Sequence, residues 1–117
     1  MRIDIISDVV CPWCYIGKRN LEAALSQWRN KNPDAPEPEV IWHPFQLNPQ
    51  LPETGVPRRE YLEQKFGGPE RAKEIYARVT AAGERAGIAF NFDRIEVQPN
   101  TVNLHRLLHY AAQHGSQ

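Results

Sequence analysis

The sequence has no excess of charge of either sign, because fourteen basic residues balance fourteen acidic ones among its 117 residues. This balance removes the electrostatic argument for nucleic acid or an anionic membrane as a partner. No apolar run approaches the roughly 20 residues that a membrane-spanning helix needs. A secretory signal is also lacking, since Met1–Ile6 carries two charges where an apolar segment would stand. We therefore expect a cytoplasmic protein whose thiols are kept reduced.

Cysteine is scarce, and both cysteines lie in one tetrapeptide, Cys11-Pro12-Trp13-Cys14. Two cysteines cannot build a disulfide scaffold that holds a small secreted domain together. The pair is therefore a candidate for a reactive site and not for a structural disulfide framework.

The first part of the chain predicts a β-α-β unit. Arg2–Ser7 alternates and is rich in isoleucine, which is typical of a strand. From Cys11 to about Asn30 the apolar residues recur at helical spacing, and Pro12 suits the first helical turn. Glu39–Phe45 predicts a second strand. Two strands joined by a helix should be parallel, with a right-handed crossover.

The rest of the chain predicts mainly helices. We expect them over 58–66 and 69–86, and over a last segment that Asn100 or Thr101 caps and that ends near His114. Ala89–Ile95 is predicted to be short and extended. The class is thus α/β, with residues 1–48 as a β-α-β unit that carries the CPWC motif and 49–117 as a helical region. Two parallel strands leave both sheet edges open, so we expect either a homodimer that supplies strands or the front portion of a longer protein.

The position of the cysteines favours redox chemistry. Cys11 would lie at the N-terminus of a helix, where backbone N–H groups and the helix dipole stabilise a thiolate and lower the thiol pKa. Cys14, one turn further on, would resolve a mixed disulfide. Two alternatives are a pair of unreactive buried cysteines and a zinc site completed by His105 and His109. The wide separation in sequence speaks against zinc, so no metal is predicted and both histidines are expected on a solvated helix face.

Two neighbours of the cysteines are further candidates. Asp8 could relay the proton that Cys14 releases, or it could simply accept hydrogen bonds from the backbone of its own turn. Trp13 projects from the tip of the predicted helix and could contact a substrate.

The motif and its surroundings resemble a known family. The segment 7–18 (SDVVCPWCYIGK) carries most of the likeness, with support from 42–49 (WHPFQLNP), 58–62 (RREYL), 87–90 (GIAF) and Asn100-Thr101 before His105-Arg106-Leu107. Together they resemble the DsbA-like thioredoxin-fold oxidoreductases of the FrnE branch, relatives of 2-hydroxychromene-2-carboxylate isomerases and kappa-class glutathione transferases.

The resemblance implies a thioredoxin fold with a helical insertion after its first β-α-β half. It implies that Cys11 attacks and that Cys14 resolves, since in the isomerase and transferase relatives a serine stands in the first position. It also places candidate substrate-binding residues at the rim of the site, namely Pro12, Trp13, Phe45, Asn48 and Asn100.

The sequence departs from the family in one respect. The family has a second half with further strands and a cis-proline that faces the cysteines. The segment Thr54-Gly55-Val56-Pro57 matches the sequence usually found around that proline. Because it precedes a predicted helix, however, Pro57 is interpreted as a helix-start residue. The second half of the fold is therefore expected to be missing from this chain.

The leading functional prediction is a thiol–disulfide oxidoreductase that acts on a disulfide- or thiol-containing protein or a small thiol. It needs no cofactor beyond the cysteine pair, although glutathione could serve as co-substrate. One alternative is a glutathione-dependent isomerase or transferase of the 2-hydroxychromene-2-carboxylate type, and another is a non-catalytic interaction module. The redox potential and the direction of catalysis stay open.

Overall fold

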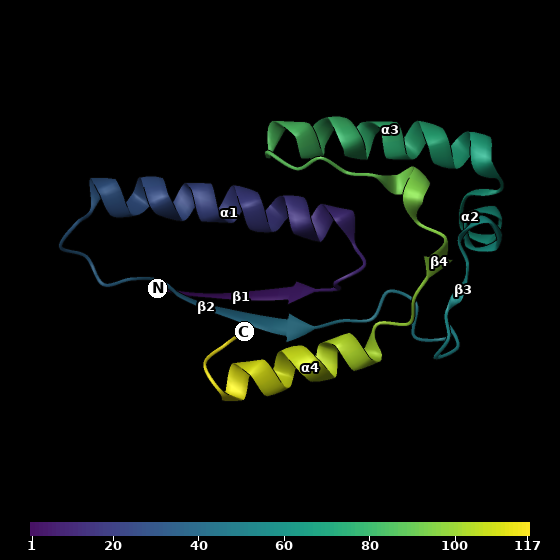
Figure 1. Cartoon of the computed structure of the whole chain (residues 1–117). Coiled ribbons are helices and arrows are strands. Elements are labelled where there is room, and N and C mark those ends of the chain that lie inside the picture. Colours follow the sequence, from purple (N-terminus) through teal and green to yellow (C-terminus); the bar gives the residue numbers. More distant parts are fainter.

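The computed structural model describes residues 1–117 and confirms a mixed α/β chain that begins with a β-α-β unit (Figure 1). Strand β1 (Arg2–Ser7) pairs in parallel with β2 (Glu39–Pro44), in a register that sets Arg2 opposite Glu39 and Ser7 opposite Pro44. Helix α1 (Pro12–Lys31) connects them. Pro12 occupies its first turn, where the missing N–H costs no helical hydrogen bond.

Three more helices follow. They are α2 (Arg58–Phe66), α3 (Pro69–Arg85) and α4 (Val102–Gln113). Gly67 ends α2 with φ of 81° and donates its N–H to the Glu63 carbonyl, a left-handed closure that suits glycine. In Figure 1, α1 lies on one side of the two-stranded sheet and α4 on the other. Helix α2 lies beyond the carboxyl ends of β1 and β2, and α3 runs back from it alongside the first part of α1.

The prediction of only two strands is wrong. Two short strands, β3 (Val56–Pro57) and β4 (Val97–Gln98), form a second, antiparallel pair. Residues 89–95 are not simply extended, because a 3₁₀ turn (η1, Phe92–Arg94) interrupts them before β4. Strands of two residues show too little alternation for the sequence to reveal them.

Pro57 lies where the sequence places it, directly before the first residue of α2. Its neighbour Arg58 donates its backbone N–H to the Glu96 carbonyl at 2.8 Å, which ties the start of α2 to the chain leading into β4. No peptide bond of the chain is cis.

The hydrophobic core is small and lies between α1 and α3. Its buried members are Ile16, Val79 and Ile88, with the aromatic rings of Tyr76, Phe90 and Phe92 packed against them. Gly83 of α3 allows this packing, because a Cβ there would lie 2.5 Å from the Phe90 ring.

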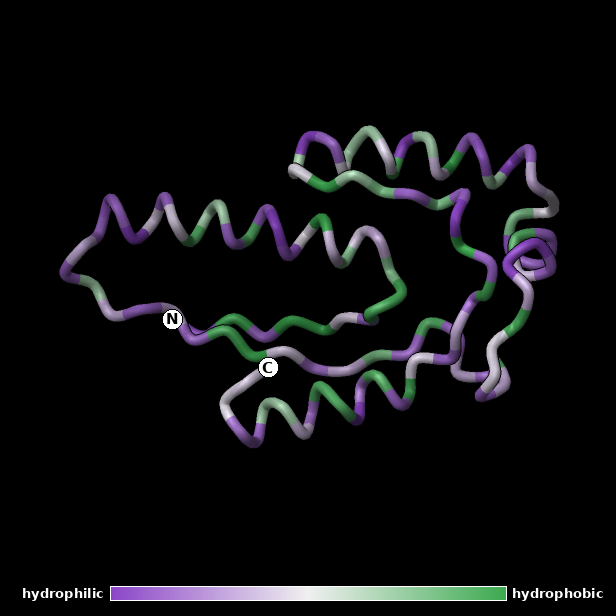
Figure 2. Tube along the Cα trace, viewed as in Figure 1, coloured by the Kyte–Doolittle hydropathy of each residue, from purple (hydrophilic) through white to green (hydrophobic).

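Much apolar surface stays exposed, since only 12 of the 117 residues are buried. Figure 2 shows apolar stretches along β1, β2 and α4. The exposed apolar side chains of α4 are Val102, Leu104, Leu107, Leu108 and Tyr110. No helix combines the length and the apolar character that crossing a membrane requires.

Candidate active site

The cysteine pair lies at the junction of β1 and α1. Cys11 is the residue that caps α1, with an extended backbone (φ −86°, ψ 114°), and Cys14 lies in the first helical turn. The Cys14 N–H donates to the Cys11 carbonyl at 3.1 Å. Both thiols are free and half-buried. The strand-to-helix junction thus presents two neighbouring thiols at a helix N-terminus, as the sequence predicts.

The balance of acidity between the thiols differs from the expectation. Burial raises the pKa of the Cys11 thiol, and the neighbouring Cys14 side chain raises it further. The backbone N–H groups of Cys14 and Trp13 favour the Cys11 thiolate, but they do not outweigh these two effects. Burial also disfavours the Cys14 thiolate. However, the Asp8 backbone N–H, the Ser7 hydroxyl and the Cys11 thiol donate to the Cys14 sulfur and hold the pKa of Cys14 below its ordinary value. The predicted lowering at Cys11 is therefore wrong for the reduced pair, because the Cys14 sulfur receives more donors.

Asp8 is buried beside the cysteines, with only 2% of its surface exposed. Its Oδ2 accepts the Leu47 backbone N–H at 2.8 Å, and its Oδ1 lies 3.0 Å from Nε2 of His105. The hydrogen bond within its own turn uses the Asp8 main-chain carbonyl, which accepts from the Cys11 N–H at 3.1 Å. The alternative in which its side chain bonds the backbone of its own turn is therefore wrong, since the carboxylate contacts Leu47 and His105 instead.

His105 is the partner that the sequence failed to reveal. It is expected to be solvated, yet it is 9% exposed, while His109 on the same helix is exposed as expected. Nε2 of His105 lies 3.0 Å from the Phe45 carbonyl as well as from Asp8. Because a carbonyl only accepts, this nitrogen carries the proton and donates to both. The Asp8–His105 pair holds α4 against the loop between β1 and α1.

A cavity of about 370 Å³ brings these groups together, and we call it the thiol cavity. Its lining includes both cysteines, Asp8, His105 and Lys18. A carboxylate, an imidazole and an ammonium group therefore share one space with two thiols. Such a set can move protons during sulfur exchange.

A second, larger cavity of about 580 Å³ also borders Cys11 and is lined mainly by apolar residues, many of them from α2, α3 and the segment 90–99. Pro12 and Trp13 line it, and Trp13 is 53% exposed. Cys11 borders both cavities, whereas Cys14 borders only the thiol cavity. Cys11 is thus the one cysteine that borders both cavities.

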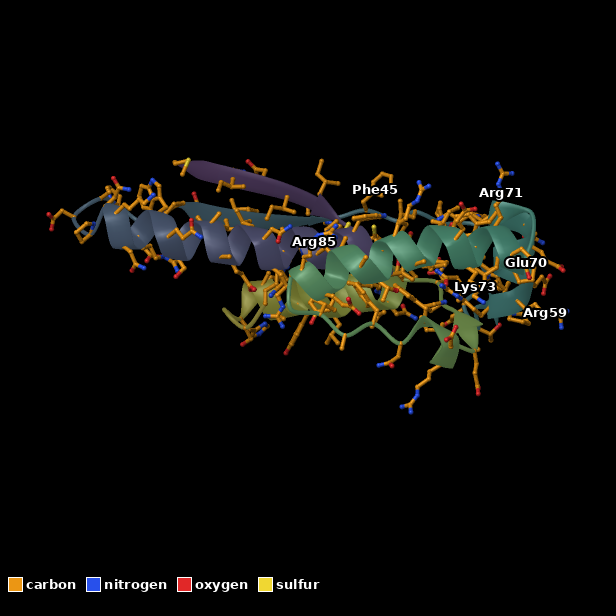
Figure 3. All side chains as sticks on the ribbon, turned by 90° about the horizontal axis from the view of Figure 1, so that it is seen from above. Phe45, Arg59, Glu70, Arg71, Lys73 and Arg85 are labelled. Atoms are coloured by element: carbon orange, nitrogen blue, oxygen red, sulfur yellow. The ribbon has the colours of Figure 1, made fainter.

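The remaining rim candidates lie outside these two cavities. The Phe45 ring is 51% exposed and projects from the surface in Figure 3. Asn100 has a structural place, because its Oδ1 accepts the Val102 N–H at 2.9 Å and its Nδ2 donates to the Leu51 carbonyl at 2.7 Å. Asn48 has a buried Nδ2 without a partner.

Asn100 rather than Thr101 therefore supplies the side chain that caps α4, a choice that the sequence leaves open. No group of three or more histidine, cysteine, aspartate or glutamate side chains is arranged to hold a metal ion. The cysteine pair and the two histidines of α4 do not form the zinc site considered above.

Comparisons with known proteins agree with this geometry. The family model of a DSBA-like thioredoxin domain matches residues 2–117. The solved structure of a probable DsbA oxidoreductase from Streptomyces coelicolor superposes with a TM-score of 0.81 at 33% sequence identity, over 98% of this chain and 48% of that one. The uncharacterised protein YwbO of Bacillus subtilis is 28% identical over 119 residues, which are 98% of this chain and 50% of that protein. The chain therefore spans about half the length of the relatives that it matches.

Proposed function

The chain belongs to the DsbA-like thioredoxin domain family, and from that premise we propose that it exchanges thiols and disulfides through Cys11 and Cys14. The observation that carries the proposal is the pair of free thiols at the N-terminus of α1, open to a cavity that also holds a buried carboxylate and an imidazole. The similar Streptomyces structure is named a probable DsbA oxidoreductase, which supports the same class of chemistry.

Cys11 is the attacking sulfur in this proposal. Its thiolate attacks one sulfur of a substrate disulfide, a Cys11–substrate disulfide forms, and the other substrate sulfur leaves as a thiolate that takes up a proton. Access supports this assignment, because Cys11 borders both cavities. The raised pKa of Cys11 limits the thiolate fraction but makes each thiolate more nucleophilic.

Cys14 completes the exchange. Its thiolate attacks the Cys11 sulfur, forms the Cys11–Cys14 disulfide and expels the second substrate thiolate. The substrate gains two electrons and the pair loses two. Cys11 has no thiol proton in the mixed disulfide, but the Asp8 backbone N–H and the Ser7 hydroxyl still donate to the Cys14 sulfur and favour its thiolate. The same steps in reverse would oxidise a dithiol.

Asp8 is the proposed proton relay. Its carboxylate is buried, lines the thiol cavity and opposes the Cys14 thiolate through its charge. Taking the Cys14 proton would remove that repulsion at the moment when the thiolate is needed. His105 orients the carboxylate by donating to its Oδ1.

The partners follow from this chemistry. The substrate would be a disulfide- or thiol-containing protein or small molecule, and a small thiol such as glutathione would recycle the pair. A homodimer and a cytoplasmic location stay predictions from the sequence.

A redox titration tests the proposal. The protein is equilibrated in mixtures of reduced and oxidised dithiothreitol and, separately, of reduced and oxidised glutathione, which together cover reducing and oxidising potentials. Each sample is quenched with acid and alkylated, and the free thiols are counted by mass. We expect one two-electron transition in which both cysteines lose their thiols together. In Cys14→Ser the transition should vanish. A pair that stays reduced in strongly oxidising mixtures would contradict the proposal.

A further inference from the structure

The second cavity has an unusual combination of lining residues, and we call it the aromatic cleft. It has a volume of about 580 Å³, and Cys11 and Trp13 are among its lining residues. Fifteen of its twenty lining residues are hydrophobic. Its aromatic members besides Trp13 are Tyr15, Tyr61, Phe66, Tyr76, Phe90 and Phe92.

A buried guanidinium lies in the wall of this cleft. Arg58 is 9% exposed, and its Cζ lies 4.9 Å from the Tyr76 ring centroid and 5.7 Å from that of Tyr61. Its Nη1 donates to the side-chain carbonyl of Gln98, which is itself 3% exposed. This is the one side-chain hydrogen bond that the guanidinium makes, although it carries five N–H groups.

The charge of Arg58 has no counter-ion. None of the ion pairs in the chain includes this residue. The cleft contains a second cation, Lys65, and neither aspartate nor glutamate is among its lining residues. Buried charges in proteins are ordinarily paired, because removing an ion from water is costly. The cleft is therefore apolar, positively charged and without an internal anion.

We propose that the aromatic cleft binds a small organic disulfide or thiol that has an apolar body and a carboxylate, with the carboxylate on Arg58 and the sulfur at Cys11. This inference rests on the proposed function, because it identifies the substrate class of the same nucleophile. A carboxylate can accept two parallel hydrogen bonds from a guanidinium, which fixes the orientation of the molecule. The rings of Tyr61 and Tyr76 hold the guanidinium, so little order has to be gained on binding.

The exchange in the cleft is balanced without any further reactant. Cys11 forms a disulfide with one half of the bound molecule, and the other half leaves as a carboxylate-bearing thiolate. Cys14 then attacks Cys11 and releases the first half. The small disulfide is reduced to two thiols, and the cysteine pair becomes the disulfide.

Two aromatic disulfides of similar size but different charge provide the test. Dithiobis(nitrobenzoic acid) carries carboxylates and dithiodipyridine carries none, and both release a coloured thiol. In Arg58→Gln we expect the reaction with the carboxylate reagent to slow by about tenfold, because a charge-assisted bond is lost. The reaction with dithiodipyridine should keep its wild-type rate.

Arg59→Gln is the matched control. Arg59 is the next residue of α2, carries the same charge, is exposed and points away from the molecule in Figure 3. Its loss should change the carboxylate reagent's rate by no more than about twofold. Equal slowing of both reagents in Arg58→Gln, or equal effects of the two arginine variants, would overturn the carboxylate site. Failure of the wild-type thiols to react with either reagent would instead overturn the proposed function.

A second measurement uses the wild-type protein and does not depend on how Arg58→Gln folds. Naphthoate should slow the reaction with dithiodipyridine by occupying the cleft, whereas the uncharged naphthamide should protect much less. Equal protection by the two compounds, or protection by neither, would contradict the proposal.

Discussion

At the scale of single residues, the surroundings of each sulfur distinguish two cysteines that share one tetrapeptide. The Cys14 sulfur receives donors from Asp8, Ser7 and Cys11. At Cys11, burial and the Cys14 thiol disfavour the thiolate, whereas the backbone N–H groups at the start of the helix favour it. Cys11 borders both cavities, whereas Cys14 ionises more readily.

Removing the Cys14 thiol should lower the pKa of Cys11. In the intact pair burial raises that pKa, and the Cys14 side chain raises it further by hydrogen bonding and charge. Serine keeps the backbone N–H but cannot become a thiolate near neutral pH, so only the opposing contribution is lost. The midpoint of the alkylation rate of Cys11 against pH should move to lower pH in Cys14→Ser. A midpoint that rises would show that the coupling has the opposite sign.

Replacing His105 should destabilise the chain. The buried Asp8 carboxylate and the Phe45 carbonyl would both lose the Nε2 donor. We expect His105→Phe to lower the free energy of unfolding by about 1–3 kcal/mol, the cost of buried acceptors without a partner. Urea denaturation measures this difference.

The exposed His109 on the same helix is the control for that measurement. Its ring nitrogen interacts only with Gln113. Substitution of His109 by Phe should change the stability by no more than about 0.5 kcal/mol. Equal losses in the two variants would mean that the Asp8–His105 contact contributes little.

Residues that act through distant partners could not be recognised from the sequence. The cysteine motif is local, so its place at the start of a helix follows from neighbouring residues. Asp8 and His105 are 97 positions apart and meet only because α4 returns to the sheet. Arg58 looks like an ordinary surface cation of α2 until β4 brings Gln98 against it.

At the scale of elements, the β3–β4 pair connects the two ends of the helical region. It joins the start of α2 to the segment before α4. The long, periodic elements β1, α1, α2 and α3 were predictable, since their patterns extend over several turns or alternations. The paired strands were not, because pairing of residues some forty positions apart leaves no local pattern.

Gly55 makes this pairing possible. It has φ of 75°, and a Cβ would lie 2.6 Å from the Gln98 main-chain oxygen. Gly55→Ala should therefore cost more than Gly67→Ala, which also has positive φ (81°) but open space around it. We expect about 1–2 kcal/mol for the backbone conformation in both variants and about 1–3 kcal/mol more at Gly55. The losses of stability are measured by urea denaturation. Equal losses in the two variants would show that the β3–β4 pair shifts easily to make room for the added Cβ.

At the scale of the whole molecule, the chain is extended and sparsely packed. Its radius of gyration is 16.7 Å, compared with about 13 Å for a compact domain of about 100 residues. The apolar face of α4 and the open edges of the β1–β2 sheet lie at the surface. Burial of apolar area is the main source of stability, so this chain has little to offset the entropy of folding.

We expect the 117-residue chain to unfold at low temperature. Its circular dichroism signal should change with a midpoint below about 45 °C, the lower end for ordinary domains, and over a broad range. A sharp transition above about 65 °C would contradict this view of the packing.

Trapping the mixed disulfide decides whether Cys11 is the attacking sulfur. Cys14→Ser and Cys11→Ser are each incubated with oxidised glutathione, and the adducts are located by mass spectrometry of peptides. We expect a stable glutathione adduct on Cys11 in Cys14→Ser, a much slower reaction in Cys11→Ser, and an internal disulfide in the wild type. An inert Cys11, or faster adduct formation on Cys14, would contradict this expectation.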